Sequence, residues 1–147
     1  YRAEDNSAQG IGKRTSRIGY AESADGVTMK RLDSPVLFPG GDEFESIECP
    51  GGCEDPRVAM TEDGLYVMLY TAWNRKTPRL AVATSKDLKN WTKHGLAFEK
   101  AYDGRFARIA TKSASILTKV KGGKLVIDKV DGKYFMYWGC RTRSYFR

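Results

Sequence analysis

The sequence predicts an all-β fold built from repeated blades, as in a β-propeller. Short aromatic and β-branched segments, each close to a turn signal, recur along its 147 residues. These segments repeat at a spacing of about 65 residues, and a repeated unit of short strands joined by turns indicates propeller blades. No window of useful length has the periodicity of a helix.

The strongest expected strand covers residues 65–73, directly after the turn signal Asp63-Gly64. Residues 133–138 repeat this pattern after Asp131-Gly132. The other expected strands are 17–22, 79–84, 113–120 and 124–130. This assignment leaves residues 38–57 as one long loop.

Two pairs of segments carry the repeat. Residues 18–25 match residues 80–87 at an offset of 62, and residues 63–68 match residues 131–136 at an offset of 68. At this spacing the chain holds roughly the first two to three blades, whereas propellers close with four or more. We therefore expect residues 1–147 to be one partial propeller domain, with no second domain and with the remaining blades supplied by the rest of a longer chain.

Composition narrows the class of partner. The net charge is +7, but basic residues are interspersed with acidic ones, so we expect no nucleic-acid partner. The longest apolar runs are too short to span a bilayer and no leader is visible, so we expect a cytoplasmic protein without a membrane contact. A homo-oligomer is compatible with the sequence.

The three cysteines, Cys49, Cys53 and Cys140, do not form a disulfide framework. Cys49 and Cys53 resemble half of a zinc site, but no second Cys/His pair follows, so we expect reduced cysteines and no metal.

The loop 38–57 holds the first candidate functional group. It ends in Gly51-Gly52-Cys53-Glu54-Asp55-Pro56-Arg57, where the paired glycines could let backbone approach a ligand. Pro56 favours an extended conformation at Asp55, and a carboxylate fixed in this way can act as a general acid. The alternative is an Asp-Pro turn whose acid is solvated or paired with Arg57.

Two further clusters could bind a sugar or an anion. Trp73-Asn74-Arg75 follows the strong strand and combines a stacking surface, an amide and a guanidinium. Lys112-Ser113 could hold a phosphate group through the lysine charge. The glycine-rich loops that bind nucleotides are absent, so we expect no cofactor.

Several segments of the chain resemble glycoside hydrolase family 130, the β-mannoside phosphorylases. The segments that carry this resemblance are residues 1–5, 18–25, 52–57, 70–72 and 85–91. The resemblance implies a five-bladed propeller with its active site at the channel mouth. It also implies inverting phosphorolysis of β-1,4-mannosides, in which mannosyl-glucose and phosphate give α-mannose 1-phosphate and glucose.

The resemblance also implies roles for individual residues. Asp55 maps onto the proton donor, which acts through a hydroxyl of the bound mannose while phosphate attacks from the opposite face. Arg75 and Lys112 map near phosphate-binding positions, and Arg2, Asp5 and Asn74 map near sugar contacts. Phosphate is then a co-substrate, and no other cofactor is implied.

Two alternatives stay open at this point. A hydrolase of the same fold would need a second carboxylate to activate water. A non-catalytic carbohydrate-binding propeller would keep the blades and could lose the acid. The acceptor sugar is also open among glucose, mannose and N-acetylglucosamine.

Overall fold

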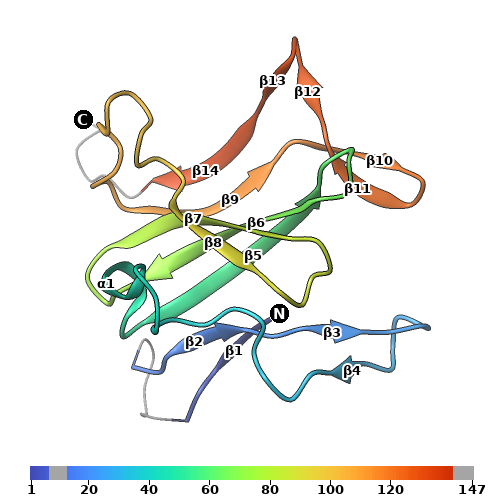
Figure 1. Cartoon of the computed structure of the whole chain (residues 1–147), viewed down its shortest axis with the longest axis horizontal. Helices are drawn as coiled ribbons and strands as arrows, with labels where there is room; N and C mark the ends of the chain where they lie inside the picture. The colour runs from blue at the N-terminus through green and yellow to red at the C-terminus, as the bar shows by residue number, and fades with distance from the viewer. Residues whose placement is uncertain (7–12, 141–147) are drawn as a thin grey trace.

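The computed structural model describes residues 1–6 and 13–140, and it is almost entirely β-structure (Figure 1). Its elements in chain order are β1 (Arg2–Glu4), β2 (Ser16–Ile18), β3 (Ala21–Glu22), β4 (Lys30–Arg31), α1 (Glu45–Glu48), β5 (Gly52–Met60), β6 (Tyr66–Trp73), β7 (Pro78–Ser85), β8 (Thr92–Leu96), β9 (Thr111–Ile116), β10 (Thr118–Lys121), β11 (Lys124–Ile127), β12 (Lys129–Val130), β13 (Lys133–Tyr134) and β14 (Met136–Cys140). The all-β prediction is confirmed.

An antiparallel meander of β5, β6, β7 and β8 forms the centre of the structure. In Figure 1 it lies between the β1–β4 segment below and the β9–β14 segment above. The pair β1–β2 joins β5 through one parallel bridge between Ser16 and Gly52, and β11 joins it through Val126 and Met60. The meander is therefore the blade against which the neighbouring segments are placed.

Both faces of β6 are buried, which explains why most of its residues are apolar. Met68, Tyr70 and Ala72 of β6 pack in one core with Ile18 and Leu37. The alternate residue Leu69 packs on the opposite face, in a second core that contains Leu80 and Ala114. A continuous apolar run of this kind is the pattern of a fully buried strand.

The second core joins the meander to the sheet of β9 and β14. Phe98 and Trp138 pack there with ring centroids 4.7 Å apart and ring planes tilted by 51°. A buried threonine adds a polar contact, because the backbone N–H of Leu80 donates to Oγ1 of Thr111 over 2.8 Å. This contact fixes the start of β9 against β7.

The matching segments of the sequence repeat form the same turn. Ser23 donates a hydrogen bond to Asp25 over 2.8 Å, and Ser85 donates to Asp87 over 3.0 Å. Each aspartate also accepts hydrogen bonds from the backbone N–H groups two and three residues later, and these bonds hold its pKa well below the usual range. The first pair of repeated segments therefore shares its turn, although the strands before the turn differ: β2 ends at Ile18 and β3 covers Ala21–Glu22, whereas β7 continues to Ser85. The domain boundaries stay a prediction.

The loop predicted for residues 38–57 is only partly correct. A single helical turn, α1, forms at Glu45–Glu48, and the last six of these residues belong to β5, which runs from Gly52 to Met60. The sequence pattern misses β5 because proline is uncommon inside a strand. Pro56 is tolerated because it lies in a β-bulge, where β5 loses register with β6 between Glu54 and Arg57.

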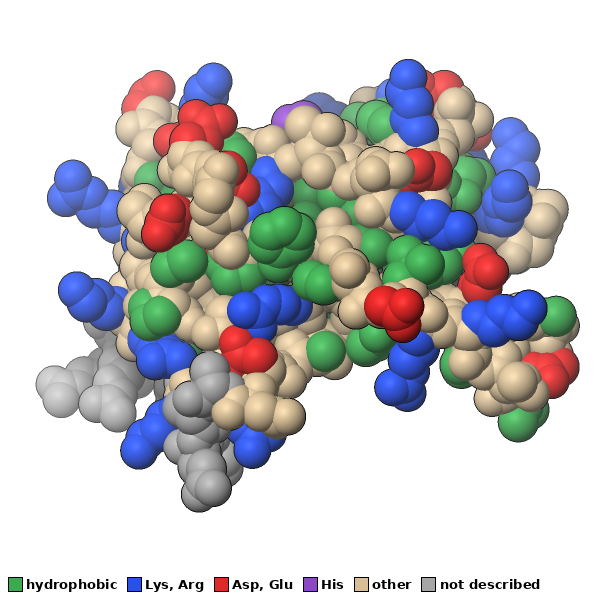
Figure 2. All heavy atoms as spheres, turned by 60° about the horizontal axis from the view of Figure 1, so that its bottom comes forward, with side chains coloured by type: hydrophobic (Ala, Val, Ile, Leu, Met, Phe, Trp, Pro, Cys, Tyr) green, Lys and Arg blue, Asp and Glu red, His purple; other side chains and the backbone are tan. Residues whose placement is uncertain are grey.

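Charged side chains of both signs are interspersed over the face drawn in Figure 2, with apolar groups exposed between them. The expectation of no nucleic-acid partner stays a prediction.

Within residues 1–6 and 13–140, no helix is long and apolar enough to cross a membrane.

A buried ion pair anchors α1 to the meander. Glu48 is fully buried, accepts a hydrogen bond from the Tyr70 hydroxyl over 2.7 Å and pairs with Nζ of Lys93 over 2.6 Å. The same Nζ reaches Asp42 over 2.7 Å. Burial raises the pKa of the Glu48 carboxyl, and the hydrogen bonds from Lys93 and Tyr70 oppose that effect. Lys93 thus allows a charge to stay inside the first core.

We expect Lys93→Met to lower the free energy of unfolding by about 3 kcal/mol, because it leaves Glu48 buried without its cation. Burial raises the pKa of this carboxyl, so a protein without Lys93 takes up a proton there as the pH falls. The loss should therefore be smaller at about pH 5 than at about pH 8. Denaturant unfolding at the two pH values measures it, with Lys119→Met, which breaks an exposed pair with Asp128, as the control. Equal losses for the two variants would contradict the prediction.

Candidate functional site

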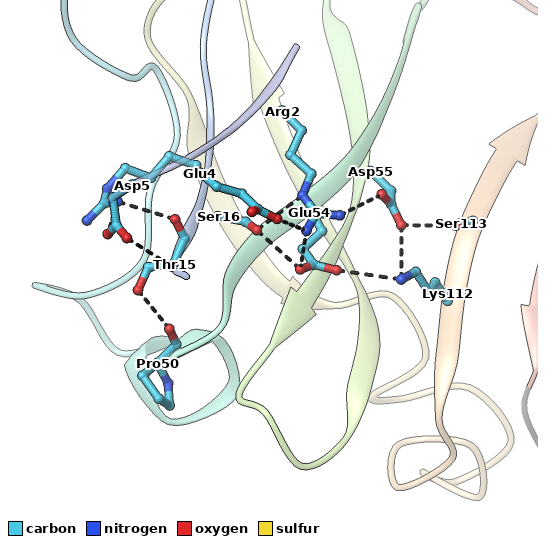
Figure 3. A network of polar contacts seen from close by, with 11 residues as sticks. Arg2, Glu4, Asp5, Thr15, Ser16, Pro50, Glu54, Asp55, Lys112 and Ser113 are labelled. Atoms are coloured by element: carbon cyan, nitrogen blue, oxygen red, sulfur yellow. Dashed lines mark hydrogen bonds and ion pairs between the residues drawn. The ribbon is translucent and has the colours of Figure 1, made fainter. Parts of the chain in front are cut away.

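The candidate site is a network of carboxylates and cations contributed by β1, β5 and β9 (Figure 3). Its centre is Asp55, whose side chain is 24% exposed. Oδ1 of Asp55 lies 3.4 Å from Nη1 of Arg2. Oδ2 lies 3.4 Å from Nζ of Lys112 and accepts a hydrogen bond from the Ser113 hydroxyl over 3.2 Å. One carboxylate thus joins three segments that are far apart in the sequence.

Glu54 lies beside Asp55 and contacts the same two cations. Its Oε1 is 3.0 Å from Nη2 of Arg2, and its Oε2 is 3.6 Å from Nζ of Lys112. The Ser16 hydroxyl donates to Oε1 over 3.2 Å, and the side chain is only 9% exposed. Glu54 is therefore a largely buried partner that holds both cations beside Asp55.

The bulge in β5 explains how two consecutive side chains reach the same cations. In a regular strand, neighbouring residues point to opposite faces of the sheet. Here Glu54 pairs with Thr71 and Arg57 pairs with Leu69, so Asp55 and Pro56 together face Tyr70. Asp55 has a φ of +48°, in the left-handed region. The extended conformation predicted for Asp55 from Pro56 is wrong, because the bulge overrides that preference and turns the carboxylate toward Glu54.

Two glycines bring β2 close to this part of β5. A side chain at Gly52, whose φ is +107°, would collide with the backbone of Ser16, and one at Gly51 would collide with Trp73. The absence of side chains at Gly51 and Gly52 therefore lets Trp73 and the backbone of Ser16 approach closely. The sequence had suggested that a ligand would approach there instead. This close approach positions Ser16 to bond Glu54.

The structure brings together three of the predicted site residues, Arg2, Asp55 and Lys112. Asp5 accepts hydrogen bonds from the backbone N–H of Thr15 over 3.2 Å and from Arg17 over 2.6 Å. In Figure 3 these contacts lie beside the network and do not reach Asp55.

The other two predicted residues make contacts elsewhere. Asn74 donates to the backbone carbonyl of Ser46 in α1, and its Oδ1 accepts bonds from the two N–H groups of its own turn. Arg75 donates to the backbone carbonyl of Lys13. Of the two residues expected to bind phosphate, Lys112 therefore lies beside Asp55 and Arg75 contacts the chain near Lys13, and their role in phosphate binding stays a prediction.

Four residues of the network were not predicted as site residues: Glu4, Ser16, Glu54 and Ser113. Glu54 precedes the acid in its motif, and Ser113 follows Lys112, so adjacency to a predicted residue was the available signal for these two. It is a weak signal because neighbours in a strand usually face opposite ways. No cluster of His, Cys, Asp or Glu that could hold a metal ion occurs among the described residues.

Comparisons with known proteins agree on one family. The glycoside hydrolase family 130 model, described as beta-1,4-mannooligosaccharide phosphorylase, matches residues 2–146. The 1,2-beta-oligomannan phosphorylase of Thermoanaerobacter sp. (strain X514) is 34% identical over 92% of this chain. The beta-1,2-mannobiose phosphorylase of the same organism is 32% identical over 85% of it.

Solved structures are similar as well. One superposes with a TM-score of 0.91 and is 64% identical over 95% of this chain. Its description states that the GH130 family of mannoside phosphorylases contains glycoside hydrolases that target beta-1,2 mannosidic linkages in Candida mannan. The chain spans 39% of the length of that structure and 39% and 34% of the two curated relatives.

The left-handed backbone at Asp55 can be tested separately from its carboxylate. We expect Asp55→Gly to be more stable than Asp55→Ala by about 1 kcal/mol, because glycine adopts a positive φ without steric strain. Both variants lose the same ion pairs, so their difference isolates the backbone. Glu62 is the matched control, because it is exposed and is not among the residues with a positive φ. Its variant Glu62→Ala should be at least as stable as Glu62→Gly. Thermal unfolding of the four variants measures both differences, and equal stability of the two Asp55 variants would refute the assignment.

Proposed function

The chain belongs to glycoside hydrolase family 130, and we propose that the protein cleaves β-mannosidic bonds with inversion, using Asp55 as its proton donor. The observation that carries the proposal is the position of Asp55 at the centre of a network with Arg2 and Lys112. Its side chain keeps partial exposure, so it can reach a substrate.

The two cations of the network are shared by three carboxylates. Glu54 contacts both cations, and Glu4 pairs with Arg2 over 2.6 Å. With three carboxylates and two cations, the ionised cluster has a net charge of −1. Neither cation is therefore an exclusive partner of Asp55, and this supports a carboxyl group that is available to a substrate.

We propose β-1,2-linked mannosides as the substrate. Both curated relatives are named for β-1,2 compounds, and the description of the 64% identical structure concerns β-1,2 linkages in mannan. The family description alone names the β-1,4 linkage. The linkage proposed from these relatives therefore differs from the β-1,4-mannosyl-glucose expected from the sequence, and the sugar released is mannose.

Phosphate is the first candidate acceptor, because the family description and both curated relatives are phosphorylases. Lys112 supports it, since this side chain is 49% exposed beside the acid and a lysine can hold phosphate as a point charge. Phosphate attack on the anomeric carbon breaks the glycosidic bond, and Asp55 supplies the proton to the leaving oxygen.

Water is the second candidate acceptor, and one observation favours it. The structure whose description concerns hydrolases is 64% identical to this chain, against 34% for the curated phosphorylase. An inverting hydrolase needs a base on the face of the sugar opposite to the acid. Glu54 does not fit that role, because its side chain is only 9% exposed and is held by both Arg2 and Lys112. The base would be another carboxylate.

Product analysis of the complete enzyme separates the two acceptors. With β-1,2-mannobiose, a phosphorylase forms α-mannose 1-phosphate only when phosphate is present, whereas a hydrolase forms free mannose in both conditions. β-1,4-Mannobiose is the matched substrate for the linkage and should be cleaved at least tenfold more slowly, a factor that corresponds to about 1.4 kcal/mol. Faster cleavage of the β-1,4 compound would reverse the proposed linkage.

Asp55→Asn should lower kcat about 10³-fold, since the amide cannot donate the proton, while the protein stays folded. Asparagine tolerates a left-handed backbone, so the change removes the acid without straining β5. The control is Asp131→Asn, an exposed aspartate with a similar φ of +49° in the β12–β13 turn. Initial rates with β-1,2-mannobiose measure both variants. An Asp55→Asn enzyme with unchanged kcat would exclude Asp55 as the acid.

A further inference from the structure

Ser113 shares an unusual backbone geometry with Asp55. Among residues 1–6 and 13–140, the network residues with a positive φ are Asp55 and Ser113, and the φ of Ser113 is +50°. Strand β9 loses register with β14 at this point: Lys112 pairs with Gly139 and Ser115 pairs with Tyr137, so Ser113 and Ala114 together face Trp138. This is the same arrangement of two residues against one that Asp55 and Pro56 make against Tyr70. Two bulges therefore face each other across the network.

The backbone conformation of Ser113 is unfavourable for a serine unless its surroundings hold it there. Glycine is the usual residue at the left-handed position of such a bulge. Strained residues of this kind cluster at functional sites, where a specific side chain is needed in spite of the strain. Glycine would relieve the strain at position 113, but it would lack the hydroxyl that bonds Asp55.

The contacts around Ser113 fix its hydroxyl in one place. Its backbone N–H lies 3.4 Å from Oγ1 of Thr71, a fully buried residue of β6. Thr71 is also the strand partner of Glu54, so the same buried threonine sets the positions of both bulges. Lys112 and Ser113, which would point to opposite faces in a regular strand, both reach Oδ2 of Asp55.

We propose that Ser113 is a positioning residue for the proton donor. Its hydroxyl donates to Oδ2 of Asp55 and thereby holds the carboxyl group in one orientation. The inference rests on the proposed function of Asp55. In this proposal, the bulge in β9 places the side chains of Ser113 and Lys112 on the same side of the strand, next to Asp55.

Two substitutions in the complete enzyme separate the hydroxyl from the backbone. Ser113→Gly removes the hydroxyl and accommodates the positive φ, whereas Ser113→Ala removes the hydroxyl and keeps the strain. We expect both to lower kcat about tenfold, the effect of one hydrogen bond to a charged group. Ser115→Ala is the matched control, because Ser115 is an exposed serine of the same strand, and it should leave kcat unchanged.

The division of the loss between kcat and KM separates a positioning role from a purely structural one. A contact that orients the proton donor acts on the proton-transfer step, so kcat should fall in Ser113→Gly while KM stays unchanged. In an Asp55→Asn background, Ser113→Gly should cause no further loss of activity.

The outcomes distinguish this inference from the proposed function. If Asp55→Asn is inactive but Ser113→Gly matches the unmodified enzyme in kcat, or changes KM alone, the role of Ser113 is refuted and Asp55 stands. A loss in Ser113→Ala that Ser113→Gly restores would also refute it, because backbone strain alone would then be responsible. If Asp55→Asn retains full activity, the proposed function fails, whatever Ser113 does.

Discussion

The candidate site depends on one backbone feature, the left-handed conformation of Asp55 inside β5. Without it, Glu54 and Asp55 would point to opposite faces of the sheet and could not contact the same two cations. Such a conformation costs a non-glycine residue roughly 1–2 kcal/mol. The contacts of Asp55 with Arg2, Lys112 and Ser113 offset this cost. Ser113 carries a similar strain on the opposite side of the network, so the geometry of the site is maintained by both strands together.

The rest of the fold makes these two conformations possible. The meander is packed on both faces, which holds β6 rigidly between its two cores. From this one strand, Thr71 supports both bulges, and Tyr70 extends into the first core to bond Glu48. Burial raises the pKa of Tyr70, and the neighbouring Glu48 adds to this effect, so the hydroxyl remains a donor. The buried ion pair and the candidate site are therefore connected through adjacent residues of β6.

The sequence predicted the fold class and the strands of the meander that have apolar patterns, and family 130 membership is confirmed. It failed at β5, because Pro56 and a cluster of acids resemble a loop, and a bulge depends on the partner strand as well as on local sequence. It proposed Asp55 and Lys112 through a motif and a resemblance, and the two side chains lie 3.4 Å apart in the structure. It could not show that Arg75 lies at the Lys13 carbonyl or that Ser113 reaches Asp55, since both facts follow from how distant segments pack.

The network also suggests how a family described as phosphorylases can contain hydrolases. In the proposed reaction, proton donation uses Asp55 and its partners, and it is the same step whether phosphate or water attacks the sugar. Phosphate is an anion, and the ionised network has a net charge of −1, so a phosphate site needs cations beyond Lys112. Water needs a base instead of those cations. A change of acceptor can therefore arise from residues on the opposite face of the sugar, while the paired bulges that hold the acid stay unchanged.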